Sequence, residues 1–345
     1  MQGILLILAA MAQRRQRRSV TEYVEGILSG DRVVLSQAIT VIESRLAEDR
    51  ALATAILEAI LPDTGNSIRI GITGVPGVGK STFIESFGGF ITGLDKKLAV
   101  LAIDPSSQRS RGSIMGDKTR METLSRDPLA YIRPSPAGTS LGGVSTRTRE
   151  TMLLCEAAGF EVIFIETVGV GQSETAVQGM VDFFLLLMLA GAGDELQGIK
   201  RGIMEMADVI TITKADGDNV KAAKKARVEY ANAVHLFPPA PSGWAPEVVT
   251  CSALHNLGLD AIWDSICRYE AKTQGSGFFQ QKRKEQNMQW MKDTVAQYLE
   301  EFFYQREAVK TELDSISAEI SAGDMTGLGA ARRLIDQFEG SLSGS

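Results

Sequence analysis

A run of residues in the first third of the sequence matches the phosphate-binding loop of nucleotide-binding proteins, G-x-x-x-x-G-K-S. The run consists of Gly74, Val75, Pro76, Gly77, Val78, Gly79, Lys80 and Ser81, and Thr82 follows it. Glycines allow backbone N–H groups to surround phosphate oxygens, and the N-terminus of a following helix adds the positive end of its dipole. In such loops the lysine reaches the β- and γ-phosphates, and the hydroxyl residue can bind Mg²⁺. The sequence therefore predicts a strand, a phosphate loop and a helix in this order.

A second motif indicates which base the nucleotide carries. Lys214 and Asp216 belong to a Thr-Lys-Ala-Asp segment after an apolar stretch, which resembles the [N/T]-K-x-D element of GTP-binding proteins. A carboxylate there can accept both N1–H and N2–H of guanine, whereas adenine would leave it unpaired at a cost in free energy. Ser252, Ala253 and Leu254 close a later apolar stretch and match the backbone-contact segment that completes such sites. These motifs together predict guanine specificity.

Three acidic residues are candidates for binding Mg²⁺ and orienting the attacking water. Asp104 follows one apolar stretch, Glu166 ends another, and Asp117 lies in a polar segment between them. The carboxyl ends of parallel strands are where α/β sheets bind ligands. We therefore assign Lys80, Asp104, Asp117 and Glu166 to catalysis, and Ser81 together with the three acids to the metal. Alternatively, Asp104 caps a helix and Asp117 is a solvated loop residue.

These motifs resemble a known family. The sequence from Glu166 to Gly169 is E-x-x-G, which resembles the G3E class of P-loop GTPases. Most small GTPases have D-x-x-G at the same place. Several other segments resemble the MeaB type of that class, the GTPase chaperones of adenosylcobalamin-dependent methylmalonyl-CoA mutase. They are D-P-S-S at 104–107, G-D-K-T-R-M at 116–121, R-P-S-P at 133–136, E-T-V-G-V-G-Q-S-E at 166–174 and G-D-E-L-Q-G-I-K at 193–200.

The resemblance implies a function and a set of partners. The chain would bind GTP or GDP with Mg²⁺, hydrolyse GTP, and gate cofactor delivery to methylmalonyl-CoA mutase while protecting that enzyme. We expect slow intrinsic turnover, because the sequence has no identifiable arginine finger. Cobalamin would be bound only through the partner enzyme. The family likeness also favours a nucleotide-sensing switch loop containing Gln197 and Lys200, although an ordinary helix start explains the same residues. The family layout further implies a homodimer.

Periodicity predicts the elements that position these residues. Apolar stretches that alternate with helical patterns predict an α/β fold, a P-loop NTPase with a mostly parallel, doubly wound sheet. We expect strands at 68–73, 98–103, 162–166, 183–189, 209–213 and 248–252. The predicted regions are a disordered start (1–18), a helical N-terminal extension (19–64), a GTPase domain (65–272) and a helical dimerisation arm (273–345). The arm's apolar positions, such as Val295 and Leu299, require a partner.

Composition narrows the functional classes. The formal net charge of −6 argues against a nucleic-acid partner. Three widely spaced cysteines favour a reducing compartment, and no apolar run is long enough to cross a membrane, so we expect a cytoplasmic protein without a membrane partner. Isolated histidines and missing ligand clusters count against the alternative of a G3E metallochaperone. A nucleotide-dependent phosphotransferase remains a further alternative.

Overall fold

The computed structural model describes residues 17–44, 46–103, 121–133, 141–167, 173–191 and 201–343. The chain divides into two compact units, Met1–Arg283 and Lys284–Ser345. The first unit contains the predicted nucleotide motifs. The second unit contains most of the helical C-terminal region.

The described residues of the first unit begin with the helices α2 (Val20–Leu28), α3 (Arg32–Glu43) and α4 (Ala47–Ile60), followed by the short 3-10 helix η1 (Leu61–Asp63). Local chemistry fixes where the first two helices begin. Ser19 and Glu22 form a reciprocal capping box at the start of α2, and the Asp31 carboxylate accepts the amides of Val33 and Val34 at the start of α3.

The centre of the first unit is a seven-stranded sheet in which every pairing is parallel. The strands are β1 (Ile68–Gly74), β2 (Leu98–Ile103), β3 (Ala130–Arg133), β4 (Val162–Thr167), β5 (Phe183–Met188), β6 (Val209–Ile212) and β7 (Glu247–Thr250). Their order is β3-β2-β4-β1-β5-β6-β7, which places β1 in the middle. Because all strands run the same way, their carboxyl ends meet along one edge of the sheet.

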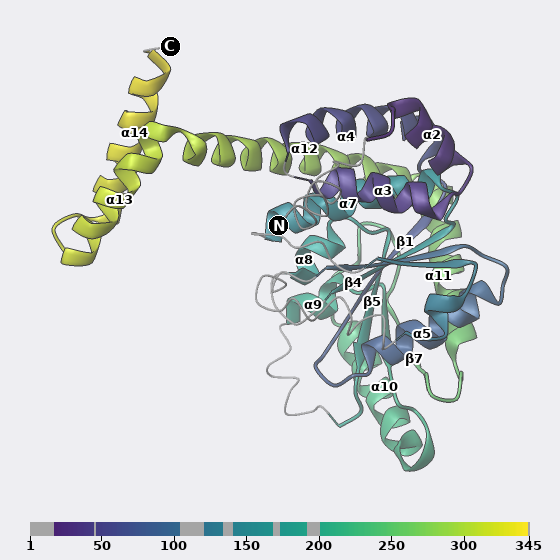
Figure 1. Ribbon diagram of the computed structural model, residues 1–345. Coiled ribbons are helices and arrows are strands. Elements are labelled where there is room, and N and C mark those ends of the chain that lie inside the picture. Colours follow the sequence, from purple (N-terminus) through teal and green to yellow (C-terminus); the bar gives the residue numbers. More distant parts are fainter. Residues whose placement is uncertain are drawn as a thin grey trace, which may run out of the picture. The chain divides into compact units, whose positions relative to one another are not determined.

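Helices cover both faces of this sheet, as the doubly wound prediction requires (Figure 1). The helices that follow the strands are α5 (Lys80–Thr92), α7 (Leu141–Ala157), α8 (Ser173–Gln178), α9 (Arg201–Met206), α10 (Val220–Val234) and α11 (Leu259–Ser276). The described parts of the connections include the 3-10 helices η2 (Leu124–Arg126) and η4 (Gly217–Asn219).

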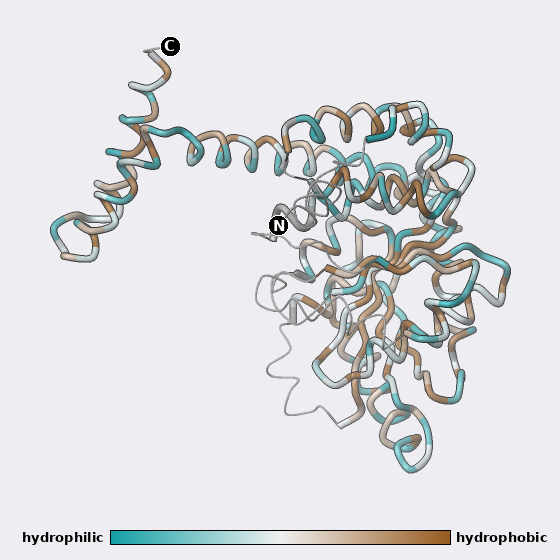
Figure 2. The backbone as a smooth tube through the Cα atoms, viewed as in Figure 1, coloured by the Kyte–Doolittle hydropathy of each residue, from teal (hydrophilic) through white to brown (hydrophobic). Residues whose placement is uncertain are grey.

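Alternation along the strands divides the core into two layers. Ile70 and Ile72 of β1 pack on one face with α5, α10 and α11, whereas Ile163 and Ile165 of β4 pack on the other face with α7 and the N-terminal helices. The strands form the apolar centre of the unit, shown in brown in Figure 2. The N-terminal helices α2, α3 and α4 therefore share a hydrophobic core with the sheet.

The second unit is helical. Helix α12 (Phe278–Gln305) begins in the first unit and continues into the second, where α13 (Glu307–Ala322) and α14 (Gly327–Ser343) follow. A small core joins α13 to α14 through Val309, Ile316, Ala330 and Leu334. No helix in the described part of the chain is long and apolar enough to cross a membrane.

The structure differs from the sequence prediction in a few details. Strand β3, a four-residue strand at the edge of the sheet, was not predicted. Thr213 and Ser252, predicted as strand residues, lie just beyond β6 and β7 and so belong to the loops at the carboxyl edge. Helix α11 continues past the predicted domain boundary at residue 273 as far as Ser276, and Gly277, whose φ is 78°, ends the helix.

We predict that Ile39 is essential to the packing of α3. Its side chain is fully buried in the core shared with α7, whereas Val33 on the same helix is 62% exposed. Ile39→Ala should lower the free energy of unfolding by about 2–5 kcal/mol, because it leaves a cavity in a packed core. Val33→Ala should change it by less than about 0.5 kcal/mol. Urea unfolding of both variants is the measurement, and equal effects would contradict the described packing.

Candidate nucleotide-binding site

The predicted phosphate loop connects the central strand β1 directly to α5. Gly77 and Gly79 have φ values of 76° and 87°, in the left-handed region that residues with a Cβ rarely adopt. Gly79 is the N-cap of α5, so Lys80 is the first residue of that helix. Residues 74–80 line a cavity of about 160 Å³. The backbone therefore forms a small concave site at a helix N-terminus, where an anion is favoured.

The Lys80 ammonium reaches the end of the neighbouring strand β4. It donates a hydrogen bond to the backbone oxygen of Thr167 and lies 3.9 Å from Oε1 of Glu166. Glu166 is only 5% exposed, so its carboxylate is mostly removed from water. The structure thus brings together two predicted catalytic residues that are far apart in the sequence. Beneath them, the Thr167 hydroxyl donates to the Thr73 hydroxyl (2.9 Å), which joins β4 to β1.

The segment after β6 is attached to the phosphate loop. The Lys214 ammonium donates to the backbone oxygen of Gly77 (2.8 Å), and the Thr213 hydroxyl donates to that of Val78 (2.9 Å). The φ of Lys214 is 54°, an unusual value for a residue with a side chain. These contacts fix the predicted base-reading segment against the predicted phosphate-binding segment.

The predicted guanine-reading residues lie together at the ends of β6 and β7. The Ser252 hydroxyl donates to Oδ2 of Asp216 and accepts the backbone N–H of His255 (3.2 Å). The backbone N–H of Ala215 donates to the oxygen of Cys251 (2.9 Å), which ties the two segments. Ser252 is fully buried, so it holds one oxygen of the Asp216 carboxylate in a fixed place. The arrangement can present that carboxylate to a base edge.

Burial controls the chemistry of the neighbouring Cys251. Removal from water, together with the nearby Asp216 carboxylate, raises the pKa of the Cys251 thiol to about 12. The thiol therefore stays protonated and neutral at physiological pH, and acts as a small apolar residue in the core.

For the other predicted site residues the structure gives only a position in the chain, or no description. Ser81 and Thr82 occupy the first turn of α5 beside Lys80, and Ala253 and Leu254 follow Ser252, with Leu254 73% exposed. The predicted metal ligands Asp104 and Asp117, and the predicted switch residues Gln197 and Lys200, lie outside the described residues. Among the residues that are described, no group of three or more His, Cys, Asp or Glu side chains is arranged to hold a metal.

Two polar residues of α5 that hold neighbouring segments were not singled out from the sequence. The Ser86 hydroxyl on α5 donates to the backbone oxygen of Ala253 (2.7 Å), so the phosphate-loop helix also fixes the second base-reading segment. The Glu85 carboxylate accepts the backbone N–H groups of Thr123 and Leu124. In an amphipathic helix, a polar residue that contacts another segment looks the same in the sequence as one that faces water. The sequence pattern therefore could not identify Ser86 and Glu85 as contact residues.

Comparison with known proteins defines the class to which this fold and site belong. The family model described as methylmalonyl Co-A mutase-associated GTPase MeaB matches residues 35–308. The chain belongs to this family of P-loop GTPases, so the predicted enzyme class and the resemblance are both confirmed.

Individual relatives agree with the family. The chain is 49% identical over 286 residues to "GTPase ArgK" of Escherichia coli, covering 83% of this chain and 86% of that protein. It is 41% identical over 335 residues to "Methylmalonic aciduria type A homolog, mitochondrial" of Mus musculus, covering 94% of this chain and 81% of that protein. A solved structure described as LAO/AO transport system kinase has a TM-score of 0.73 and 38% identity, and the match covers 94% of this chain and 99% of that chain.

We predict that Asp216 sets the preference for guanine. Asp216→Asn should weaken GTP binding roughly 10- to 100-fold, because a hydrogen bond to a charged group is worth about 1.5–3 kcal/mol. It should strengthen binding of xanthosine triphosphate, which has an acceptor where guanine has the N2 donor. Asp218→Asn, an exposed change two residues away, is the control. Titration calorimetry with GTP, ATP and xanthosine triphosphate measures these effects. Equal affinity of the unaltered protein for ATP and GTP would refute the assignment.

Proposed function

We propose that this chain uses GTP binding and hydrolysis to act as a chaperone for an adenosylcobalamin-dependent methylmalonyl-CoA mutase, gating cofactor delivery and protecting the enzyme. The match of the family model over residues 35–308 carries the proposal. The contacts that tie Lys214 and Asp216 to the phosphate loop and to Ser252 support guanine as the base. The absence of any pair of neighbouring cysteines and the three free thiols agree with a cytoplasmic location.

The chain's own residues supply most of the chemistry of hydrolysis. The backbone N–H groups of the phosphate loop and the start of α5 would hold the β- and γ-phosphates, and the Lys80 ammonium would stabilise the charge on the transferred group. The Ser81 hydroxyl and the carboxylates of Asp104, Asp117 and Glu166 offer the oxygen ligands that Mg²⁺ prefers. When bound, the metal neutralises developing negative charge on the phosphates. Glu166 would also orient the attacking water.

A separate segment would report the nucleotide state to the mutase. We assign this role to the polar residues around Gln197 and Lys200, which come after β5 and lie outside the nucleotide motifs. Residues of this kind contribute to the coupling free energy between two sites rather than to the affinity of either site.

We predict that Lys200→Ala separates coupling from catalysis. GTP affinity and intrinsic hydrolysis should stay nearly unchanged, whereas stimulation of hydrolysis by the mutase should fall roughly 5- to 150-fold, the range of typical coupling energies. GTP turnover is measured for both proteins, with and without the mutase. Unchanged stimulation in the variant would show that this segment is an ordinary helix start. Loss of turnover without the mutase would instead place Lys200 in the catalytic site.

We also propose that the chain forms a homodimer through its C-terminal unit. On α12 five of the exposed apolar residues recur at intervals of three and four, which places them along one side of the helix. They are Met288, Met291, Val295, Leu299 and Phe302, with exposures between 39% and 59%. A helix in water with such a stripe gains free energy when a second apolar surface covers it.

We predict that the dimer depends on this stripe. Leu299, which is 59% exposed, has no fold-stabilising burial to lose, so Leu299→Glu should lower the mass measured by light scattering from that of a dimer to that of a monomer. Glu300→Gln changes the net charge by one unit in the opposite direction, at a position that points away from the stripe by helical periodicity, and it should leave the dimer intact. A monomer for the unaltered protein at micromolar concentration would contradict the proposal.

A further inference from the structure

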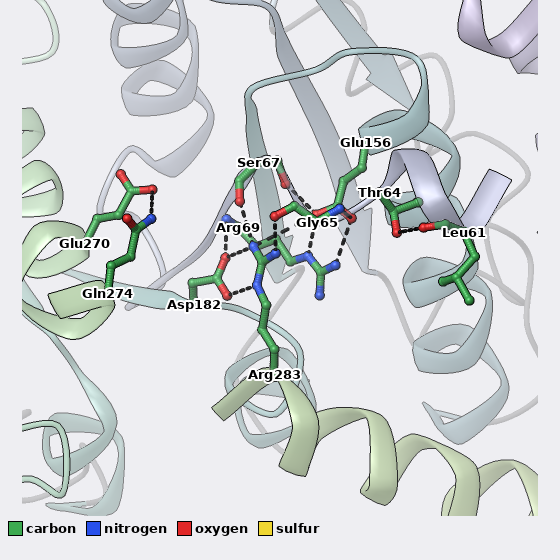
Figure 3. Close-up of polar contacts among 10 residues, drawn as sticks. All are labelled: Leu61, Thr64, Gly65, Ser67, Arg69, Glu156, Asp182, Glu270, Gln274 and Arg283. Carbon is green, nitrogen blue, oxygen red and sulfur yellow. Dashed lines mark hydrogen bonds and ion pairs between the residues drawn. The ribbon is translucent and has the colours of Figure 1, made fainter. Parts of the chain in front are cut away.

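A buried network of charged residues lies at the amino ends of the strands, the sheet edge opposite the candidate nucleotide site (Figure 3). It joins segments that are distant in the sequence: the approach to β1, the end of α7, the residue before β5 and the first turns of α12. None of its residues belongs to the phosphate loop or to the base-reading segments.

One half of the network is an ion pair between Arg69 of β1 and Glu156 of α7. The Arg69 guanidinium donates to both oxygens of Glu156 (2.8 and 2.9 Å), and the Ser67 hydroxyl and the Gly65 N–H donate to the same carboxylate. Burial opposes ionisation of Glu156, but Arg69 and its other partners hold the pKa of that carboxyl below its ordinary value. This pair fixes the start of β1 to α7.

The other half connects β1 and β5 to α12. Nε and Nη2 of Arg283 donate to the two oxygens of Asp182 (2.8 and 2.6 Å). Its Nη1 and Nη2 donate further to the backbone oxygens of Gly65 (2.7 Å) and Ser67 (2.6 Å). The Asp182 carboxylate also accepts the backbone N–H of Arg69 (2.8 Å). A single guanidinium thus binds three separate points at this edge of the sheet.

Neighbouring residues reinforce the contact. Lys282 donates to the backbone oxygen of Asp182 (2.7 Å), and the Arg283 guanidinium lies 4.6 Å from the centre of the Phe279 ring. Asp182 is 1% exposed, so without Arg283 its charge would remain buried with far fewer partners. Removing one partner of a buried ion pair is strongly destabilising. The site therefore strongly favours the state in which α12 is attached.

We propose that Arg283 is an anchor that makes the start of α12 a fixed part of the nucleotide-binding unit. The boundary between the two compact units falls directly after this residue. Gly277, which ends α11, therefore lies on the amino-terminal side of this anchor. The anchor holds the beginning of β1, the strand whose other end is the phosphate loop, so the start of α12 is attached to the strand that carries the phosphate-binding residues.

Hydrogen exchange of the full-length chain tests this anchor. The amides of residues 282–286 have helical partners and report whether the start of α12 stays attached. In Arg283→Met these amides should exchange at least about tenfold faster than in the unaltered protein. Lys284→Met, a change of the adjacent exposed lysine, should leave the rates within about twofold.

A second variant distinguishes detachment of the start of α12 from unfolding of the neighbouring sheet. Arg283→Met alone leaves the Asp182 charge buried, which can also speed exchange in β1. Arg283→Met combined with Asp182→Asn removes that charge, while the amide oxygen can still accept the Arg69 N–H. In this double variant the amides of 282–286 should still exchange at least about tenfold faster, with exchange in β1 unchanged. Unaltered protection of 282–286 in the double variant would overturn the proposal, as would exchange that rises equally in β1 and α12.

Discussion

The parallel alignment of the strands is the constraint on which the candidate site depends. Since all pairings in the described sheet are parallel, the ends of β1, β4, β6 and β7 meet at one edge. The phosphate loop, Asp216 and Ser252 follow the ends of β1, β6 and β7, Glu166 lies in the last two residues of β4, and short hydrogen bonds join these segments across the edge. The two hydrophobic layers stabilise this alignment, so the packing of helices far from the site also determines its geometry.

Much of the fold was predictable from the sequence because its signals are local. The strands of the central sheet are short aliphatic runs buried on both faces, such as Val162–Thr167, and a buried parallel strand has this composition. β3 could not be predicted, because Ala130–Arg133 lacks a run of consecutive aliphatic residues. The sharing of a core between α3 and the sheet also has no local signal. Amphipathic periodicity shows that a helix has an apolar face, but not which surface covers it.

The parts of the candidate site that could be predicted are those whose residue types and spacing suit one kind of chemistry. Glycines before Lys80 permit a backbone conformation that other residues avoid, so the phosphate loop could be identified without a structure. The supporting contacts of Ser86 and the anchor at Arg283 were not predictable. Arg283 lies in a charged helical pattern typical of a solvated helix, and its partner Asp182 is 101 residues away in the sequence. Only the fold brings such pairs together, so sequence patterns describe the reacting groups better than the framework that holds them.

The central claim is that this chain is a GTPase whose phosphate loop acts through Lys80. The most direct measurement is release of inorganic phosphate by the purified protein from GTP and, separately, from ATP, in the presence of Mg²⁺. We expect slow turnover of GTP, little turnover of ATP at equal concentration, and none above background for Lys80→Ala, since that variant loses the charge that stabilises the transferred phosphoryl group. Equal turnover of both nucleotides, or GTP hydrolysis by Lys80→Ala near the rate of the unaltered protein, would contradict this account.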